Sequence, residues 1–283
     1  MNEKIKIGIV GLGYVGKAIQ EFFKNKFEIY SYDIKEDSSC DSLDKVVENS
    51  NIIFLCLPTP MNLDGSASTI ILEDVISEIN TLCSNKELKT IVIKSTVPVG
   101  TTENLSLKYN NISLVFNPEF LTEANFMDDF KNQNRIILGG NNLDTVHILY
   151  AKTFEKAEIV KTDYRTAEMV KYVINCFLAT KVSFANEIES FCSHMNIDYK
   201  DMISIACLDK RLGYSHWMVP GNDGKRGFSG SCFPKDISSL INQFDQNKIE
   251  SVILKACFDR NCNIDRVEKD WEKLIGRAVS EKS

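Results

Sequence analysis

Several residue types are scarce or lack the spacing that a disulfide scaffold, a metal centre or a membrane protein would need. The chain has nine cysteines but no CxxC pair, and the odd number fits poorly with a complete set of disulfides. It has only three histidines, which argues against a zinc site. No apolar run reaches the length of a membrane span, and residues 1–5 lack the apolar core of a signal peptide. We therefore expect a cytoplasmic protein with reduced thiols, no bound metal and no membrane partner.

An excess of positive charge is also absent. Lysine and arginine number 33 against 39 aspartates and glutamates, and the net charge of -6 argues against a general nucleic-acid-binding protein. An anionic ligand would need local positive charge instead. The 283 residues are 43% hydrophobic and 25% charged, the composition of a soluble globular chain long enough for two domains.

A glycine-rich motif follows the first apolar segment. Residues 4–10 are typical of a buried strand, and a helical pattern extends from the motif to Phe23. The motif between them is a GxGxxG, Gly11-Leu12-Gly13-Tyr14-Val15-Gly16. In this context the first glycine makes the tight turn, the second lets the backbone approach a pyrophosphate, and the third lets helix and strand pack closely. The sequence therefore predicts a dinucleotide-binding fold.

Asp33 ends the next predicted strand, 27–32, and lies 17 residues after Gly16. An acidic side chain at that place can accept hydrogen bonds from the adenosine ribose hydroxyls and would repel a 2′-phosphate. Taken alone, Asp33 could equally be an ordinary turn residue. Together with the glycine motif it favours NAD over NADP.

The alternation of strands and helices continues through the first half of the chain. It predicts a doubly wound parallel (Rossmann) sheet, in an α/β domain over residues 1–165. Ligands gather at the carboxyl ends of the strands in such sheets, so Thr59, Thr96 and Glu119 should face the nicotinamide. The further predicted strands are 51–57, 90–95, 113–116, 135–139 and a last one near 157–160, and the predicted helices are 43–49, 69–83 and one from 101.

The second half of the chain has helical patterns. Apolar residues recur at helical spacing over 166–194 without proline or glycine, which predicts one long central helix. The glycine-rich stretch 213–230 is long for a connector and is predicted to be a binding loop. Residues 166–283 should therefore form the central helix and a smaller all-α domain, with further helices at 198–208, 236–243 and 248–261 and a charged helical tail at 265–283.

One cysteine has surroundings that favour reactivity. Cys232 follows a loop of small residues and precedes Pro234, and proline is favoured in the first turn of a helix. The thiol is therefore expected at a helix N-terminus, with Lys235 three residues on, and both features favour the thiolate that a nucleophile needs. The alternative is a buried, inert thiol.

Six motifs occur in order between Gly8 and Asp236: GLGYVG, PTP, STVPVG, NPEFLTEA, AEMVKYVINCFLATKVSFANE and GFSGSCFPKD. In this combination the chain resembles the UDP-glucose dehydrogenase family, within the nucleotide-sugar 6-dehydrogenases. Phe233 and Lys235 resemble the UDP-glucose branch more than the GDP-mannose branch, which tends to carry leucine after the cysteine.

The resemblance implies an NAD-dependent, four-electron oxidation of UDP-glucose at C6, giving UDP-glucuronate. It implies that Cys232 holds the aldehyde as a thiohemiacetal and then as a thioester. Lys171 and Asn175 would stabilise the oxyanion, although helical periodicity alone favours a surface lysine and a tolerated polar residue. The set implied for water activation is Asp236, Glu119 and Glu123, with Thr96 orienting the water; a salt-bridged surface pair is the alternative for the two glutamates.

The resemblance also implies which residues bind the ligands. The NAD-binding set is Gly11, Gly13, Tyr14, Val15, Gly16, Asp33, Pro58, Thr59, Thr96, Glu123 and Lys235. The UDP-glucose-binding set is Glu119, Phe120, Leu121, Lys171, Asn175, Lys225, Arg226, Gly227, Phe228 and Gly230. Lys225 and Arg226 are the candidates for the phosphates. A homodimer through the central helix is implied as well.

The chain departs from the family pattern at four places, one of which is the loop Trp217 to Arg226, which is longer than usual. Ser229-Gly230 replaces a common glycine pair, Thr122 stands where many bacterial members have arginine, and the family continues into a third domain that helps hold the nucleotide, so we expect a short form. A sister dehydrogenase for UDP-N-acetyl sugars or GDP-mannose stays open as an alternative. So does a non-catalytic NAD-binding subunit, although a decayed enzyme need not retain Cys232 and Lys171.

Overall fold

The computed structural model of the chain describes residues 4–84 and 88–281. These residues form two compact units. The first comprises the described residues up to Thr59 together with Thr69–Lys171, and the second comprises Pro60–Ser68 and the described residues from Tyr172. Residues 1–3, which begin the stretch tested for a signal peptide, and the last two residues of the expected helical tail lie outside the described part.

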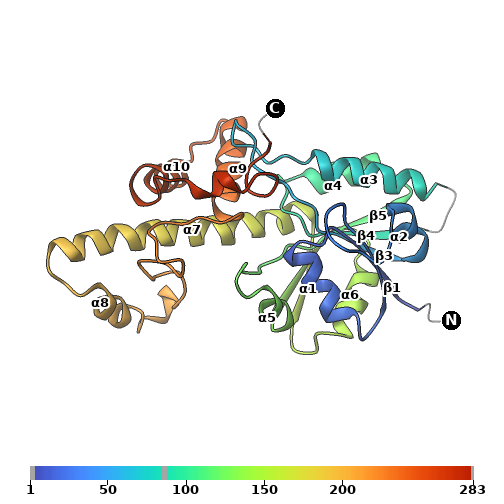
Figure 1. Cartoon of the computed structure of the whole chain (residues 1–283), viewed down its shortest axis with the longest axis horizontal. Helices are drawn as coiled ribbons and strands as arrows, with labels where there is room; N and C mark the ends of the chain where they lie inside the picture. Colours follow the sequence, from blue (N-terminus) through green and yellow to red (C-terminus); the bar gives the residue numbers. More distant parts are fainter. Residues whose placement is uncertain (1–3, 85–87, 282–283) are drawn as a thin grey trace. The chain divides into compact units, whose positions relative to one another are not determined.

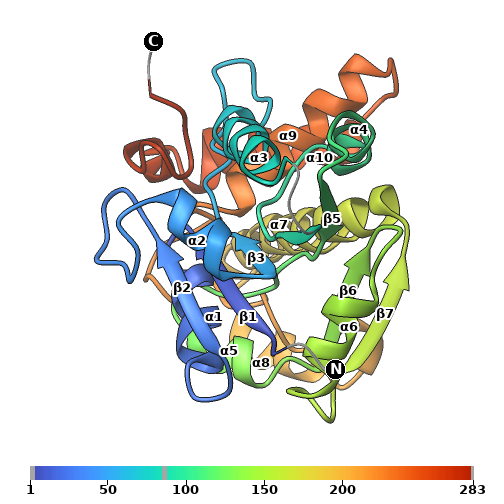
Figure 2. The ribbon, with the colours of Figure 1, turned by 90° about the vertical axis from the view of Figure 1, so that its right-hand side faces the viewer.

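A seven-stranded sheet forms the centre of the first unit (Figure 2). The strand order is β2-β1-β3-β4-β5-β6-β7, and every neighbouring pair is parallel except β5 and β6, which meet through one antiparallel pairing at Phe116 and Gly139. The predicted doubly wound sheet is therefore confirmed, with its last two strands reversed. The strands are β1 Lys6–Val10, β2 Glu28–Tyr32, β3 Ile52–Leu55, β4 Lys89–Ile93, β5 Ile112–Phe116, β6 Arg135–Gly139 and β7 Glu158–Thr162.

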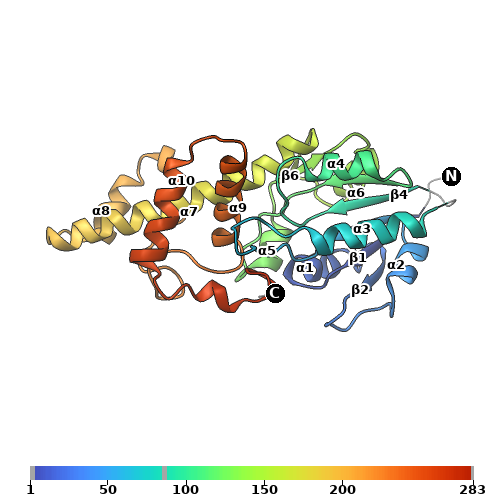
Figure 3. The same ribbon diagram turned by 90° about the horizontal axis from the view of Figure 1, so that it is seen from above.

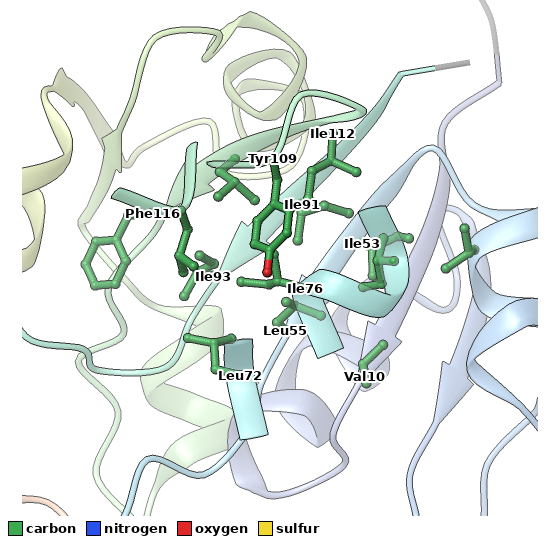
Figure 4. Close-up of a cluster of buried hydrophobic side chains, with 14 of the residues drawn as sticks. Val10, Ile53, Leu55, Leu72, Ile76, Ile91, Ile93, Tyr109, Ile112 and Phe116 are labelled. Atoms are coloured by element: carbon green, nitrogen blue, oxygen red, sulfur yellow. The ribbon is translucent and has the colours of Figure 1, made fainter. Parts of the chain in front are cut away.

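The central strands are apolar because both faces of the sheet are covered. Along β3, Ile53 and Leu55 enter one hydrophobic cluster, whereas Ile52 and Phe54 enter the other. This division follows from the period of two along a strand, which sends alternate side chains to opposite faces. Figure 4 shows the first cluster, where Ile53 and Leu55 meet other strand residues and side chains of the covering helices.

Helices cover both faces of the sheet (Figures 1 and 2). Helices α2 Leu43–Asn49, α3 Ile70–Leu82 and α4 Thr101–Lys108 contribute to the first cluster, and α1 Tyr14–Phe23, α5 Phe126–Lys131 and α6 Asp144–Ala151 to the second. The sequence analysis did not predict α5 and α6, because helices of six and eight residues carry little periodicity.

A long helix, α7 Tyr164–His194, extends over 31 residues and agrees with the predicted central helix (Figure 1). The division between the two units falls within it, after Lys171. The described part of the second unit is helical, and α9 and α10 cross α7 (Figure 3). Its other elements are α8 Tyr199–Ala206, the 3₁₀ turn Lys210–Leu212, α9 Phe233–Gln246, α10 Val252–Arg260, the π-helical turn Asn261–Asp265 and the 3₁₀ turn Asp270–Lys273.

The prediction of a helical tail over 265–283 is wrong for its described residues. Beyond Asp265, which ends the π-helical turn, only Asp270–Lys273 is helical among them, and Ile275 and Val279 form β-bridges. Lys269 and Gly276 have left-handed backbone angles, φ 44° and 76°, which interrupt a right-handed helix. Trp271 is fully buried, so tertiary packing determines the path of this segment.

No helix in residues 4–84 and 88–281 combines the length and the apolar composition that crossing a membrane requires.

Candidate active site

The strand order places the glycine motif at a topological switch point. Strands β1 and β3 are neighbours, and the chain continues from β1 to β2 on one side and from β3 to β4 on the other, so the connections from their carboxyl ends run in opposite directions. Ligands of doubly wound sheets bind at this crevice. The motif residues Gly11–Gly16 follow β1, and the segment containing Pro58 and Thr59 follows β3.

The three glycines have distinct roles in the turn. Gly11 has φ 93°, and a Cβ there would lie 2.5 Å from the carbonyl oxygen of Cys56. A Cβ on Gly16 would lie 1.9 Å from the carbonyl oxygen of Gly11, whereas one on Gly13 would meet nothing within 4 Å. The backbone is thus tight at the first and third glycines and open at the second, where Tyr14 and Val15 begin α1. These residues fit the pyrophosphate of a dinucleotide.

Asp33 is tied to the same turn. Its Oδ2 accepts a hydrogen bond from the amide of Leu12 at 2.6 Å, and its Oδ1 accepts from Lys35 at 2.7 Å and from Glu36 at 3.1 Å. Burial raises the pKa of Asp33, but these three amides lower it, and the net result is a pKa below the usual value. The carboxylate is therefore ionised and fixed beside the glycine turn, where it can meet ribose hydroxyls.

The segments after β3 and β4 are bound to each other. Thr59 is buried, and its hydroxyl donates to the carbonyl oxygen of Thr96 at 2.7 Å. The hydroxyl of Ser95 donates to the carbonyl oxygen of Leu57 at 2.7 Å and accepts from the Leu57 amide at 3.1 Å. Thr59 and Thr96 are thus brought together at the carboxyl edge of the sheet.

Glu119 and Lys171 form a buried ion pair. The Lys171 ammonium donates to Glu119 Oε1 at 2.9 Å and to the Glu119 carbonyl oxygen at 2.6 Å, and it lies 5.6 Å from the centroid of the Phe120 ring. Glu119 Oε2 accepts from the amide of Leu121 at 2.7 Å. Burial raises the pKa of Glu119, but the nearby Lys171 ammonium and the Leu121 amide lower it below its usual value overall. Lys171 is therefore no surface residue, contrary to what periodicity alone favours.

The next residues on this loop are exposed. Glu123 lies in the exposed stretch 122–125, ahead of α5. Thr122, which departs from the family pattern, donates from its amide and its hydroxyl to Asp129 Oδ2, at 2.7 and 2.5 Å. Thr122 therefore anchors the loop to the start of α5.

Sequence analysis missed a second buried lysine at the same edge. The Lys94 ammonium donates to Asn117 Oδ1 at 2.9 Å, and the Tyr150 hydroxyl donates to the same oxygen at 2.6 Å. Burial lowers the pKa of Lys94 to about 8, with the charge of Lys171 adding to the decrease and the negative charge of Glu119 opposing it. The sequence feature that could have indicated this lysine is the presence of a charged residue near the end of the apolar run 90–95.

In the second unit, Cys232 caps α9 at its N-terminus, as predicted. It is the N-cap residue, Pro234 lies in the first turn, and the Asp236 amide donates to the Cys232 carbonyl oxygen at 2.8 Å. The side chain is half-buried, and each of the nine cysteines is a thiol rather than half of a disulfide. Cys232 thus lies at the positive end of a helix of 14 residues.

A buried polar group lies in the first turn of α9. Asp236 Oδ2 accepts from the Asn175 side-chain amide at 2.6 Å, and its Oδ1 accepts from the Lys235 ammonium. All three side chains are buried. Because Lys235 is paired with Asp236, it offers Cys232 less positive charge than an unpaired ammonium would.

The two cations proposed for the phosphates have partners within the second unit. Lys225 contacts Glu268 at 2.9 Å and Asp270 at 3.2 Å. Arg226 pairs with Glu189 and donates to the Asn186 carbonyl oxygen at 2.7 Å. Either side chain would have to exchange these partners to bind a phosphate. Gly227, Phe228 and Gly230 belong to the same loop, ahead of Cys232.

The fold and the site define a class: a two-unit protein of the dehydrogenase type, with a dinucleotide-binding sheet and a helical unit that carries a cysteine at a helix N-terminus. Comparison with known proteins then gives the family. The chain belongs to the UDP-glucose/GDP-mannose dehydrogenase family, whose NAD binding domain matches residues 35–157 and whose central domain matches residues 165–263.

Two relatives in sequence illustrate the likeness. A UDP-glucose 6-dehydrogenase of Rickettsia bellii is 39% identical over 223 residues, which are 76% of this chain and 50% of the relative. The Bacillus subtilis protein YtcA, provisionally assigned as a UDP-glucose 6-dehydrogenase, is 30% identical over 98% of this chain and 73% of its own length. The chain thus spans about half the length of the Rickettsia relative.

Solved structures support the same fold. A UDP-glucose dehydrogenase of Pyrobaculum islandicum matches with a TM-score of 0.81 at 27% identity, over 92% of this chain and 68% of the other. A GDP-mannose dehydrogenase of Pseudomonas aeruginosa matches with a TM-score of 0.68 at 26% identity, over 92% and 69%.

Proposed function

We propose that this protein is an NAD-dependent nucleotide-sugar 6-dehydrogenase that oxidises UDP-glucose to UDP-glucuronate. The observation that carries the proposal is the position of Cys232 at the N-terminus of α9, ahead of the buried Asn175–Asp236 pair. A two-unit dehydrogenase that only interconverts an alcohol and a carbonyl has no need of such a thiol. The relatives that are UDP-glucose 6-dehydrogenases favour UDP-glucose as the sugar nucleotide.

The first unit has the groups that NAD requires. The open backbone at Gly13 would take the pyrophosphate, and Asp33 would hold the adenosine ribose. Thr59 and Thr96 shape the carboxyl edge where the nicotinamide would lie. NAD, when bound, would supply the hydride acceptor for the oxidation of the alcohol and for the oxidation of the thiohemiacetal.

Cys232 supplies the covalent step in this proposal. Its thiolate sulfur forms a bond to the aldehyde carbon, and the carbonyl electron pair moves to the oxygen, which becomes the hydroxyl of a thiohemiacetal after protonation. Once that carbon has been oxidised, it is a thioester. Water then adds to the thioester carbon and loses a proton to a carboxylate, and the C–S bond breaks to return the thiolate.

The polar pairs in each unit supply charge and proton transfer. The Asn175 amide and the Lys171 ammonium are hydrogen-bond donors suited to an oxyanion, because each is buried and therefore acts in a poorly screened environment. Asp236, which is buried, and Glu119, whose side chain is 12% exposed, are carboxylates suited to receive the proton of water. Each carboxylate is held by a donor within its own unit, which fixes its orientation.

We also propose that two copies associate through α7. Large apolar side chains on this helix are exposed at spacings of four and seven residues, namely Val173, Phe177, Phe184 and Phe191. Such a stripe is typical of a helix that packs against another surface.

A substrate panel tests the proposed activity. NADH formation at 340 nm is measured with UDP-glucose, a UDP-N-acetyl sugar and GDP-mannose, for the wild type and for Cys232→Ser. We expect turnover of UDP-glucose above the other two, and no release of UDP-glucuronate by the variant. Preference for another sugar would reassign the substrate. Tight NAD binding without turnover of any of them would instead indicate a non-catalytic subunit.

A further inference from the structure

The loop ahead of Cys232 is held by the segment that follows α10. Asn261 is fully buried, and its Oδ1 accepts a hydrogen bond from the Phe228 amide at 2.8 Å. Its Nδ2 donates to the Phe228 carbonyl oxygen at 3.0 Å. One side chain thus satisfies both backbone groups of a residue that lies four positions before Cys232.

Arg266 adds contacts on either side of Phe228. It is 2% exposed, and it donates to the carbonyl oxygen of Arg226 at 2.9 Å and to Asp270 Oδ1 at 3.1 Å. Asp270 in turn accepts from the Ser229 hydroxyl. Burial raises the pKa of Asp270, but the Ser229, Arg266 and Lys225 side chains lower it to about 2. The carboxylate is therefore charged at neutral pH and binds the loop on both sides.

The loop backbone also fits closely against this segment. Gly227 has φ 67°, a conformation that side chains disfavour. A Cβ there would lie 2.4 Å from Asn261 Oδ1, 3.1 Å from Asp265 Cβ and 3.2 Å from Arg266 Cβ. A glycine is therefore required at 227 by the neighbouring chain as well as by the turn.

The backbone between Asn261 and Arg266 has an unusual form. Residues Asn261–Asp265 make a π-helical turn, closed by a hydrogen bond from the Arg266 amide to the Asn261 carbonyl oxygen at 2.8 Å. The extra residue in such a turn places Asn261 and Arg266 at its two ends. Single π turns are rare and occur frequently at functional sites.

From this geometry we propose that Asn261 and Arg266 are positioning residues for Cys232. They fix the backbone at 226–229, so the chain enters Gly230 and the N-cap of α9 in one conformation. A loop rich in glycine and serine would otherwise sample many conformations, and the sulfur would sample them with it. The catalytic part of the inference rests on the proposed function, whereas the ordering of the loop does not.

The test compares Asn261→Ala with wild type and with Asn263→Ala as a matched control. Asn263 is the same residue type, two positions along the same π turn, and it is exposed. Backbone hydrogen exchange is followed by mass spectrometry in peptides covering 226–232 and in peptides of the first unit. Alkylation of Cys232 by iodoacetamide is followed by peptide mass spectrometry.

We expect Asn261→Ala to accelerate exchange over 226–232 at least tenfold and to change the alkylation rate of Cys232 at least threefold. Exchange in the first unit and NAD affinity should stay at wild-type values. In Asn263→Ala, every readout should stay at its wild-type value. Where turnover is measured, kcat should fall while the KM for NAD is unchanged.

Unchanged exchange and alkylation in folded Asn261→Ala would overturn the inference. An equal rise in exchange across both units would also overturn it, because that result indicates a general loss of stability. Should Asn261→Ala fail to fold, Arg266→Lys carries the same test, since it keeps the charge but loses the guanidinium's fixed set of donors. Hydrogen exchange and alkylation can be measured without turnover. The ordering of the loop is therefore tested even if the proposed activity is not found.

Discussion

At the scale of single residues, the two buried lysines of the first unit differ in how their charge is compensated. Lys171 contacts the Glu119 carboxylate, whereas Lys94 donates to the neutral amide oxygen of Asn117. A buried ammonium without an ionic contact loses hydration that a neutral acceptor replaces only in part. This explains why burial lowers the pKa of Lys94 to about 8.

The pH dependence of stability tests the state of Lys94. Between its folded pKa of about 8 and its usual value of 10.5, the unfolded chain keeps a proton that the folded chain has lost. The free energy of unfolding contributed by Lys94 therefore rises with pH through this window. We expect the wild type to gain about 1 to 3 kcal/mol relative to Lys94→Met between pH 7.5 and 10.5, measured by urea unfolding. A constant difference would contradict the low pKa.

The Glu119–Lys171 pair predicts a large cost when one partner is removed. Lys171→Met leaves a buried carboxylate without its cation and should destabilise the first unit by about 3 to 5 kcal/mol. Adding Glu119→Gln should recover part of that loss. Because the pKa of Glu119 is lowered in the folded state, the wild type should lose this stabilisation as the pH falls below about 4.5. The free energy of unfolding is measured with denaturant for the single and double variants. A double variant as unstable as Lys171→Met would argue against the pairing, and so would losses in the two single variants that simply add.

At the scale of elements, α7 also anchors the start of α4. Glu168 is fully buried on α7, and its carboxylate accepts from the Gly100 amide at 2.5 Å and from the Thr102 amide at 2.8 Å. These amides belong to the first turn of α4 and have no partner within that helix. Since Thr96 lies just before this turn, the contact fixes the segment that carries it.

Replacing Glu168 tests this anchor. Glu168→Gln keeps one acceptor but turns an amide donor toward a backbone N–H, which should cost about 1 to 3 kcal/mol in the unfolding of the first unit. The matched control is Glu103→Gln, in the same turn of α4 but at a half-exposed ion pair with Arg165. That change should cost under about 1 kcal/mol. Equal losses of unfolding free energy in the two variants would show that the buried Glu168 contact stabilises the first unit no more than the half-exposed ion pair does.

How much of the structure could be predicted from the sequence also differs between kinds of element. The strands and α1 could be predicted because runs such as Ile52–Leu55 and the motif Gly11–Gly16 carry their signal within a few residues. The same holds for Cys232 at the start of α9. The contacts of Asn117 with Lys94 and Tyr150 could not be predicted, because they join segments distant in sequence. Asn261 was missed for the same reason, since its partner Phe228 lies 33 residues away.

At the scale of the whole molecule, the account includes self-association through the apolar stripe of α7. Phe177 is 65% exposed, so replacing it should leave the fold of one copy intact. We expect the wild type to have twice the mass of one chain by light scattering at micromolar concentration, and Phe177→Glu to shift toward the mass of one chain. A monomeric wild type, or a variant with unchanged mass and circular dichroism, would contradict this role of the stripe.

The central claim is that Cys232 holds the sugar between two oxidations. It is tested most directly by the number of NADH molecules formed per UDP-glucose consumed, with the sugar limiting and NAD in excess. The account predicts two NADH and one UDP-glucuronate for each UDP-glucose in the wild type. One NADH per sugar, with an aldehyde as the product, would contradict the four-electron mechanism and leave Cys232 without its proposed role.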